Sequence, residues 1–166
     1  MSVEPDREPV DYIALTREAY SRLGYRPYRW ASNEDLPSWV PLRKPLSEAR
    51  LGMIASGGIY RNGQVAFTHK DDVTHREIPT DVDTRDLRVT HFAYDQTDAR
   101  QDPNVIFPID TLRTLVAEGT VGELAALALT FMGGIYSQRR LGSELIPVLV
   151  ERTLELEVDA VLLVPV

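Results

Sequence analysis

Cysteine is absent from this chain of 166 residues. The absence excludes, within these residues, a disulfide framework, a cysteine-ligated zinc or iron–sulfur site and a cysteine nucleophile. No apolar run reaches the roughly 18 residues that a membrane-spanning helix needs. The polar, acidic start of the chain also lacks a signal-peptide pattern. We therefore expect a cytoplasmic protein that does not enter a membrane.

Basic residues are outnumbered, since 18 Lys and Arg stand against 25 Asp and Glu and give a formal net charge of -7. Nucleic-acid binding depends on clustered basic side chains and is therefore not expected. Nine of the acidic residues lie between Asp71 and Asp102. Their simplest interpretation is a solvated acidic loop region, because charged side chains usually face water.

Residues 1–50 predict an N-terminal helix followed by an extended arm. Asp11 can cap a helix over residues 9–23, in which Leu15, Ala19 and Leu23 recur at helical spacing. The stretch that follows holds four prolines, which forbid a long helix. The aromatic side chains of the arm need burial against the core or a partner subunit. These aromatic residues are Tyr25, Tyr28, Trp30 and Trp39.

Residues 51–166 predict one α/β domain. Apolar runs indicate strands at 51–55, 87–92, the second half of 124–131 and 158–166. Helical periodicity indicates helices at 109–118 and 138–157, and Pro147 must lie in the first turn of the second helix or kink it. Polar composition predicts loops at 61–83 and 93–106. This alternation favours a mostly parallel sheet with flanking helices in Rossmann- or flavodoxin-like layers.

A short internal repeat follows two of the predicted strands. Gly57-Gly58-Ile59-Tyr60 recurs as Gly133-Gly134-Ile135-Tyr136. Paired glycines at the carboxyl end of a strand allow either a tight turn or the close approach of a ligand to backbone N–H groups. Both interpretations stay open. Neither pair matches the dinucleotide or P-loop fingerprint, so a standard nucleotide site is not expected.

Metal and hydrolase sites have weaker support in the sequence. The histidines, His69, His75 and His91, are not at a recognised metal-ligand spacing, so no metal is expected. Ser56 lies before Gly57 but lacks the G-x-S-x-G turn of an α/β-hydrolase nucleophile.

An ordered series of segments resembles a known family over roughly residues 50–166. The series comprises Ser56–Tyr60, Thr74–Val82, Leu87–His91, Tyr94-Asp95, Asp102–Pro108, Val121–Leu124, Phe131–Gly133 and Val158–Val166. The family is that of selenoprotein B of the glycine, sarcosine and betaine reductases, together with the D-proline reductase subunit. Each segment alone is a weak signal, but their shared order is more specific.

The resemblance implies an oxidoreductase that uses a disulfide as acceptor. In the family a selenocysteine or cysteine follows the last of these strands, and a second cysteine comes a few residues later. The reaction is reductive cleavage at the α-carbon of a small amino-acid-like substrate: glycine, an N-methylglycine or D-proline. A pyruvoyl group on a partner subunit holds the substrate amine. A selenol or a low-pKa thiol suits this reaction because it is strongly nucleophilic at neutral pH.

This sequence departs from the family because it stops at Val166, where the redox residue would follow. We therefore expect a truncated chain, or one in which a UGA codon for selenocysteine is read as stop. No cofactor is expected within the chain itself. The catalytic residue is thus unknown, and ten residues are candidates for the substrate pocket: Ser56, Gly57, Gly58, His91, Tyr94, Asp95, Asn104, Met132, Gly133 and Gly134.

Several of these residues have alternative interpretations. His91 could hydrogen-bond a substrate carboxylate or relay a proton, or it could simply be held by a neighbouring carboxylate such as Asp95. Asn104 can order its loop, and Tyr94 suits a packing position. The acidic segment could also shape a loop over the crevice.

Two other functions remain open for the whole chain. One is a non-catalytic binding or assembly module of the same fold, which docks a partner subunit or a second copy of itself. The other is an unrelated reductase that binds a nucleotide at the paired glycines.

Overall fold

The computed structural model describes residues 11–27, 31–32 and 34–166 and divides the chain into two compact units, Met1–Ser38 and Trp39–Val166. In the first unit, helix α1 (Tyr12–Arg22) begins at Asp11, whose carboxylate accepts a hydrogen bond from the Ala14 N–H at 2.9 Å. Gly24 follows the helix with a positive φ of 77°. The predicted helix is confirmed, apart from its first residues, which lie outside the described part.

The predicted arm is extended, but the structure does not bury its described aromatic side chains. Tyr25 and Trp39 are 62% and 87% exposed. Tyr28 and Trp30 lie outside the described residues. The first part of the second unit, up to the short 3₁₀ turn Leu46–Glu48, is also open to solvent.

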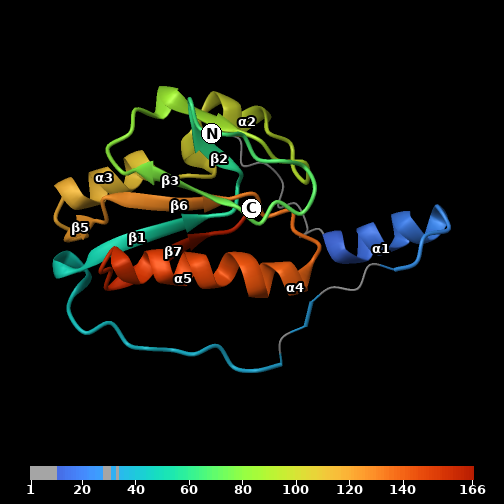
Figure 1. The fold of residues 1–166 in the computed structure, drawn as a ribbon, viewed down its shortest axis with the longest axis horizontal. Helices are drawn as coiled ribbons and strands as arrows, with labels where there is room; N and C mark the ends of the chain where they lie inside the picture. Colours follow the sequence, from blue (N-terminus) through green and yellow to red (C-terminus); the bar gives the residue numbers. More distant parts are fainter. Residues whose placement is uncertain (1–10, 28–30, 33) are drawn as a thin grey trace, which may run out of the picture. The chain divides into compact units, whose positions relative to one another are not determined.

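A mixed, mostly parallel sheet forms the centre of the second unit (Figure 1). Its central strand β1 (Arg50–Ala55) pairs in parallel with β5 (Glu123–Leu124) and β6 (Leu127–Phe131) along one edge. Strand β7 (Ala160–Val164) pairs in parallel with the other edge of β1. Strand β3 (His75–Pro79) runs antiparallel to β6 and forms the far edge. The predicted α/β fold is confirmed.

Two predicted loops and one predicted strand differ from the structure. Strand β3 lies within the stretch 61–83, for which polar composition predicts a loop. Helix α2 (Thr97–Gln101) and the 3₁₀ turn Pro103–Val105 interrupt the predicted loop 93–106. The predicted strand at 87–92 is shorter.

This shorter strand, β4 (Leu87–Val89), follows the 3₁₀ turn Thr84–Asp86 and does not join the parallel sheet. It pairs antiparallel with β2 (Ile59–Arg61) in a separate two-stranded sheet. The Asn62-Gly63 turn leaves β2 with Gly63 at a φ of 91°.

The helices follow the predicted pattern closely. Helix α3 (Ile109–Ala117) ends near Gly119, whose φ is 74°. The second predicted helix comprises α4 (Gln138–Arg140), a π-helical turn (Leu141–Leu145) and α5 (Ile146–Glu155). Pro147 lies in the first turn of α5, as predicted. Since proline has no N–H to donate, the wider π-helical turn before it accommodates the missing backbone hydrogen bond.

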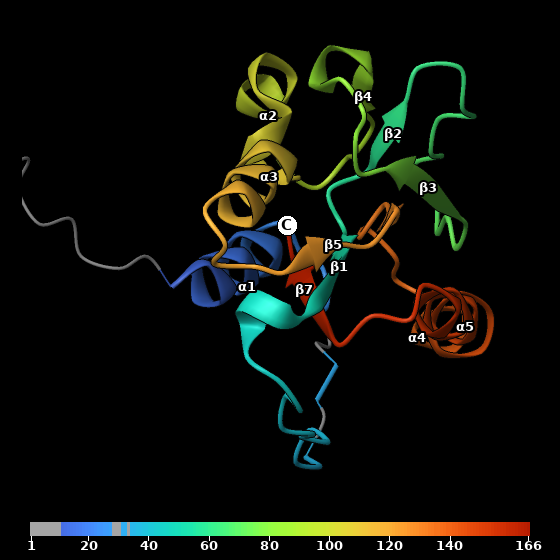
Figure 2. The same cartoon turned by 90° about the vertical axis from the view of Figure 1, so that its left-hand side faces the viewer.

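Helices α3 and α5 cover opposite faces of the sheet (Figure 2). The larger core cluster includes Met53, Ala55 and Ala128 from the sheet together with Phe107 and Leu112. The smaller cluster lies beneath α5 and is formed by Leu129, Ile135, Leu145 and Leu149. Neighbouring residues on β1 and β6 thus alternate between the two cores, as the pleat of a strand requires. Among the described residues, no helix has the length and hydropathy to cross a bilayer.

Candidate functional site

The carboxyl ends of β1, β6 and β7 meet at one edge of the sheet, where Ser56 connects them. The Ser56 N–H donates to the Val164 carbonyl at 3.0 Å, and its own carbonyl accepts from the Gly133 N–H at 2.8 Å. Its hydroxyl oxygen accepts from the Val166 N–H at 3.0 Å. Ligands of open α/β sheets bind outside such carboxyl ends. Ser56 is therefore the structural centre of the candidate site.

A hollow of about 310 Å³ opens beside Ser56. Its walls are mostly apolar, and it is lined by Ile54, Ser56, Phe131, Gly133, Leu163, Val164, Pro165 and Val166. The Ser56 hydroxyl supplies the side-chain polar group in this lining. The hollow can therefore hold a small group that combines an apolar surface with one hydrogen-bonding atom.

The first glycine pair lets the chain leave β1 and turn beneath the loop that follows β4. Gly58 has a φ of 72°, and a Cβ atom placed on it would lie 2.1 Å from the Thr90 carbonyl oxygen. The Gly58 N–H donates to Phe131, and its carbonyl accepts from the Thr90 N–H at 3.0 Å. A Cβ atom on Gly57 would meet Ile106 at 2.8 Å. This pair therefore serves a close approach between the chain's own segments.

The second glycine pair has the same sequence context but a different backbone. Neither Gly133 nor Gly134 has a positive φ. A Cβ atom on Gly134 would lie 2.2 Å from the Phe92 ring, and one on Gly133 would lie 3.0 Å from the Ser56 Cβ. These glycines make room for side chains that arrive from β1 and from the loop after β4.

His91 is buried next to the first glycine pair, with 3% of its surface exposed. Its Nδ1 accepts a hydrogen bond from the Ala93 N–H at 3.0 Å, whereas the buried Nε2 has no partner among the described residues. Burial lowers the pKa of His91, and the nearby His69 lowers it further. The ring is therefore neutral at pH 7, and because Nδ1 is an acceptor, Nε2 carries the proton.

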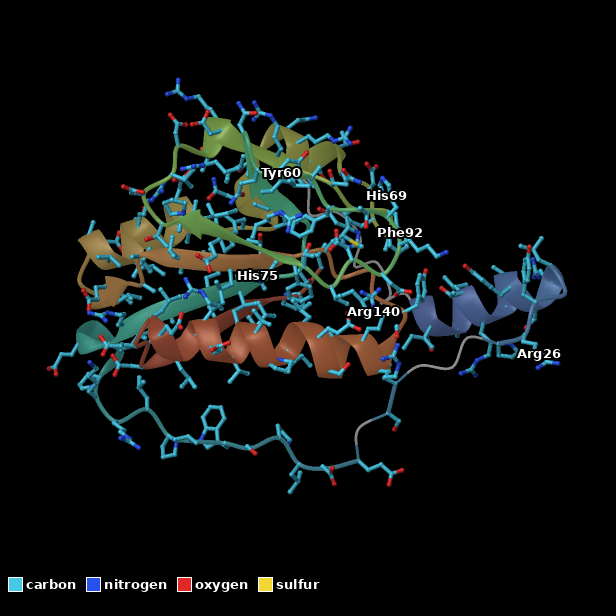
Figure 3. The ribbon with its side chains drawn as sticks, viewed as in Figure 1. Arg26, Tyr60, His69, His75, Phe92 and Arg140 are labelled. Atoms are coloured by element: carbon cyan, nitrogen blue, oxygen red, sulfur yellow. The ribbon has the colours of Figure 1, made fainter. Side chains whose placement is uncertain are left out.

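Aromatic rings connect His91 to the loop after β6. The Phe92 ring stacks on His91 with 5.8 Å between centroids and lies 5.9 Å from Tyr136. His69 contacts the other side of this group, 6.5 Å from Phe92, and both are labelled in Figure 3. His91 does not line the hollow beside Ser56. Its Nε2 atom is buried.

The structure places eight of the ten predicted pocket residues around the strand ends. Asp95 and Asn104 lie elsewhere. Tyr94 is half-buried, and its hydroxyl donates to the Gly57 carbonyl at 2.8 Å. Burial raises the pKa of Tyr94. Met132 is fully buried and forms an isolated bridge with Gly57. Tyr94 and Met132 therefore pack against the loops of the site.

Asp95 and Asn104 order the segments before α2 and α3 through local hydrogen bonds and do not line the hollow beside Ser56. Asp95 accepts hydrogen bonds from the Thr97 N–H and hydroxyl at 2.9 and 2.7 Å, which lower its pKa. It makes no hydrogen bond to His91, whose Nδ1 accepts from the backbone instead. Asn104 accepts from the Asp110 N–H at 3.0 Å at the start of α3. Asn104 thus orders its loop, as its residue type suggests.

The acidic segment is ordered by specific contacts and is not uniformly solvated. Asp72 is buried, which raises its pKa, but hydrogen bonds from Thr74 and Thr68 outweigh this effect and lower the pKa overall. Asp71 has a φ of 45° and accepts hydrogen bonds from the Tyr136 and Ser137 N–H groups at 2.6 and 3.1 Å. This contact anchors the loop to the start of α4, and the sequence gives no signal for it.

The titratable side chains do not suggest a metal site. Within the described ranges, no three His, Asp or Glu side chains come close enough to hold an ion. His75 lies on β3 and contacts Glu77 at 3.6 Å. His69 and His91 belong to the aromatic group instead.

Comparison with known proteins gives a match over most of the chain. The profile of the family described as glycine/sarcosine/betaine reductase selenoprotein B matches residues 28–166. The D-proline reductase subunit gamma of Acetoanaerobium sticklandii is 35% identical over 127 residues, which cover 76% of this chain and 52% of that subunit. No solved structure matches the chain.

Two further relatives are components of related complexes. The sarcosine reductase complex component B subunit beta of Peptoclostridium acidaminophilum is 31% identical over 90 residues, 51% of this chain and 21% of that protein. The glycine reductase complex component B subunit gamma of Carboxydothermus hydrogenoformans is 30% identical over 89 residues, 51% of this chain and 20% of that protein. The chain thus spans about half the length of the first relative and about a fifth of the others. The match over residues 28–166 shows that the chain belongs to the glycine/sarcosine/betaine reductase selenoprotein B family.

Proposed function

We propose that the chain is a subunit, or part of a subunit, of a reductase complex that cleaves a bond at the α-carbon of glycine, an N-methylglycine or D-proline. One observation carries the proposal: Ser56 holds the carboxyl ends of three parallel strands around a small hollow. The relatives support it, since they are named as subunits of D-proline, sarcosine and glycine reductases.

The site fits the selenocysteine or cysteine that the family resemblance implies after Val166. The bond between the Val166 N–H and the Ser56 hydroxyl oxygen fixes the end of β7 at the hollow. A residue joined to Val166 would therefore enter the site at this edge. A selenol or thiol supplies a nucleophile toward carbon, and a second thiol resolves the product as a disulfide. The resemblance assigns the pyruvoyl group to a partner subunit, and nothing in this chain is needed to hold it.

The overall reaction fixes what the site must do. Two thiols lose two electrons and two protons and become a disulfide. The carbon–nitrogen bond of the substrate breaks, a carbon–hydrogen bond replaces it, and the nitrogen leaves as an amine that gains a proton. Ile54 and Phe131 give the hollow apolar walls, and the Ser56 hydroxyl can donate to a substrate carboxylate.

His91 holds the loop around the site in the proposed arrangement. Its neutral Nε2–H could donate to a carboxylate, which agrees with the hypothesis that His91 hydrogen-bonds a substrate carboxylate. The atom is buried and does not line the hollow, so the structure brings it into no contact with a group bound there. His91 lies beside the turn in which the Thr90 N–H donates to the Gly58 carbonyl.

A chimeric complex tests the proposal. Residues 39–166 of this chain replace the matched segment of the A. sticklandii D-proline reductase subunit gamma, and dithiol-dependent reduction of D-proline, glycine, sarcosine and betaine is measured. We expect reduction of at least one substrate, and Ser56→Ala lowers kcat/KM about tenfold by removing one hydrogen-bond donor. Thr120→Ala is the matched control on an exposed turn. An assembled chimera that reduces none of the four substrates contradicts the proposal.

A non-catalytic assembly module is the second candidate. The exposed apolar side chains of α5 and β7, including Val150 and Leu163 at 53% and 66%, favour it because such surfaces mark interaction sites. In the same experiment this candidate predicts a complex that assembles normally but in which Ser56→Ala has no effect on rate.

A further inference from the structure

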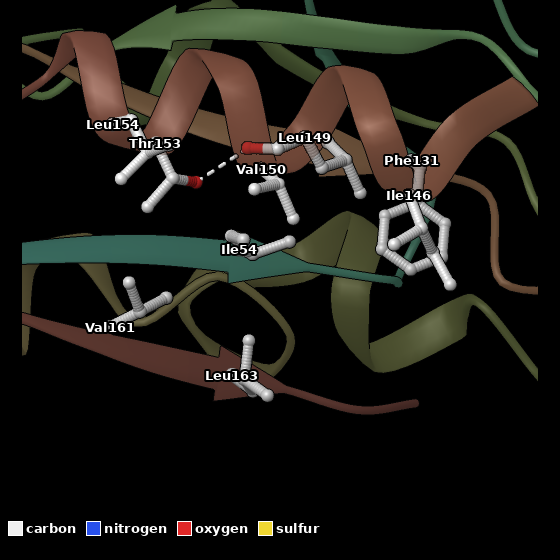
Figure 4. A pocket seen from close by; sticks show the side chains of 9 residues that line it. All are labelled: Ile54, Phe131, Ile146, Leu149, Val150, Thr153, Leu154, Val161 and Leu163. Atoms are coloured by element: carbon white, nitrogen blue, oxygen red, sulfur yellow. Dashed lines mark hydrogen bonds between the residues drawn. The ribbon is translucent and has the colours of Figure 1, made fainter. Parts of the chain in front are cut away.

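An apolar groove of about 480 Å³ runs between helix α5 and strand β7 (Figure 4). Thr153 is the single polar residue of its lining, and its hydroxyl already donates to the Leu149 carbonyl at 2.6 Å. The other lining residues are Ile54, Phe131, Ile146, Leu149, Val150, Leu154, Val161 and Leu163. The groove therefore offers apolar contact and no free side-chain donor, which suits the apolar side of a helix.

The side chains that border the groove are unusually exposed for their type. Leu154 on α5 is 73% exposed, Val150 is 53% exposed, and Leu163 on β7 is 66% exposed. Burying apolar side chains stabilises a protein, so leaving several in water costs stability that a covering element would recover.

Strand β7 also forms an edge of the sheet in the described second unit. In the described part of the chain, β1 is the one strand that pairs with β7. Residues 160–164 contain no charge and no proline, the features by which edge strands usually prevent further pairing. The edge is therefore competent to accept another strand.

The handedness of the connections between parallel strands predicts which element fills the groove. The chain passes from β6 through α5 to β7, and connections between parallel strands are right-handed in almost all proteins. A further connection in the same direction, from β7 to a strand beyond it, places its helix on the same face of the sheet as α5. Ile54 and Leu163 contribute to the groove from that face (Figure 4).

We propose that in the assembled reductase subunit this surface is covered by a helix followed by a parallel strand, supplied by the part of the subunit that this chain does not span. The helix fills the groove, and the strand pairs with the free edge of β7. The length of D-proline reductase subunit gamma is consistent with such an addition, because the match covers 52% of it.

The proposed surface is continuous with the candidate site. Ile54, Phe131 and Leu163 line both the groove and the hollow beside Ser56. The added helix would therefore complete one wall of the hollow. The proposal rests on family membership and not on the proposed reaction, so either can fail without the other.

Co-expression as two separate polypeptides tests the proposal. The first is this 166-residue chain, and the second is the part of A. sticklandii D-proline reductase subunit gamma that lies outside the matched segment. We expect the two to purify as a one-to-one complex. Leu163→Glu and Val150→Glu should each lower the recovered partner about tenfold or more, because a charge would be buried without a counter-ion.

Controls distinguish a specific interface from non-specific hydrophobic association. Val65→Glu alters a residue that is 77% exposed and outside the groove, and it should leave the complex intact. Intact subunit gamma, in which the surface is already covered, should not capture the second polypeptide. Thermal unfolding followed by circular dichroism verifies that each variant folds, as expected for changes at exposed positions.

Three outcomes overturn the proposal. The first is a cooperatively folded chain that recovers no partner. The second is equal recovery with Leu163→Glu and with Val65→Glu. The third is a dimer of the chain that Leu163→Glu dissociates in the absence of the second polypeptide, since a second copy would then be the occupant of the surface.

Discussion

Replacing Gly58 with alanine should destabilise the protein far more than an ordinary glycine-to-alanine change in a turn. Gly58 has a φ of 72°, and the added Cβ would lie 2.1 Å from the Thr90 carbonyl oxygen. That carbonyl cannot easily retreat, because the Thr90 N–H donates to the Gly58 carbonyl and the Gly58 N–H donates to Phe131. The collision is thus between two backbone segments that hydrogen bonds hold together.

Gly63 provides a matched control for the size of the effect. Its φ is 91°, and a Cβ placed on it would meet nothing within 4 Å. Gly63→Ala should therefore cost only the left-handed conformation, about 1 kcal/mol, part of which is offset by reduced freedom of the unfolded chain. Gly58→Ala adds the collision, for which overpacking costs of about 1 to 3 kcal/mol are typical. We expect a total loss of about 2 to 4 kcal/mol.

Urea unfolding followed by far-ultraviolet circular dichroism measures both free energies. The m-values should agree between the variants, so that the shift in midpoint reports stability alone. Equal losses for Gly58→Ala and Gly63→Ala would refute the reasoning, because they would show that Thr90 does not constrain the turn.

Three further predictions concern charged groups. The pKa of His91 in the folded protein is below its ordinary value of 6.5, so the unfolded chain takes up a proton at a higher pH than the folded protein does. The free energy of unfolding therefore falls as the pH drops below 6.5, and His91→Gln should flatten this dependence in thermal melts. The pKa of Asp83 is held at about 2 by Arg85, and nuclear magnetic resonance titration of Arg85→Gln should show it rising toward 3.8. Arg152 donates to Glu77 at 2.6 Å and lowers its pKa, so Arg152→Gln should lower the free energy of unfolding at pH 7 in urea unfolding, and by less below pH 4.5.

Elements with a strong local signal could be predicted from the sequence. Strands β1 and β7 read as continuous apolar runs, and helix α3 shows regular periodicity up to Gly119. Strand β3 could not be found in this way, because Ile78 is its single buried residue and its other side chains are half-exposed at the edge of the sheet. Its existence depends on pairing with β6, about fifty residues away along the chain.

The site was predictable in outline, because strands of a parallel sheet bring their carboxyl ends together. This principle selects Ser56 and the glycine pairs without any structure. The role of Asp71 was not predictable, since its partners Tyr136 and Ser137 are 65 and 66 residues away. The strand partner of β4 was also not predictable from the sequence. Alternation of apolar and polar residues in Leu87–Val89 indicates a strand but not the sheet that it joins.

The central position of β1 has a consequence for the order in which the molecule is assembled. The hydrogen bond from the Arg50 N–H to the Asp159 carboxylate closes a loop of 109 residues, and β7 leaves the ribosome after β1, β5 and β6. During synthesis, one edge of β1 therefore stays unpaired until nearly all of these residues have emerged. Such long-range pairing makes folding slow and leaves an apolar strand open to wrong partners. The small β2–β4 sheet closes a much shorter loop and can form first, so that it holds the turn at Gly58 before the strands beneath it are complete.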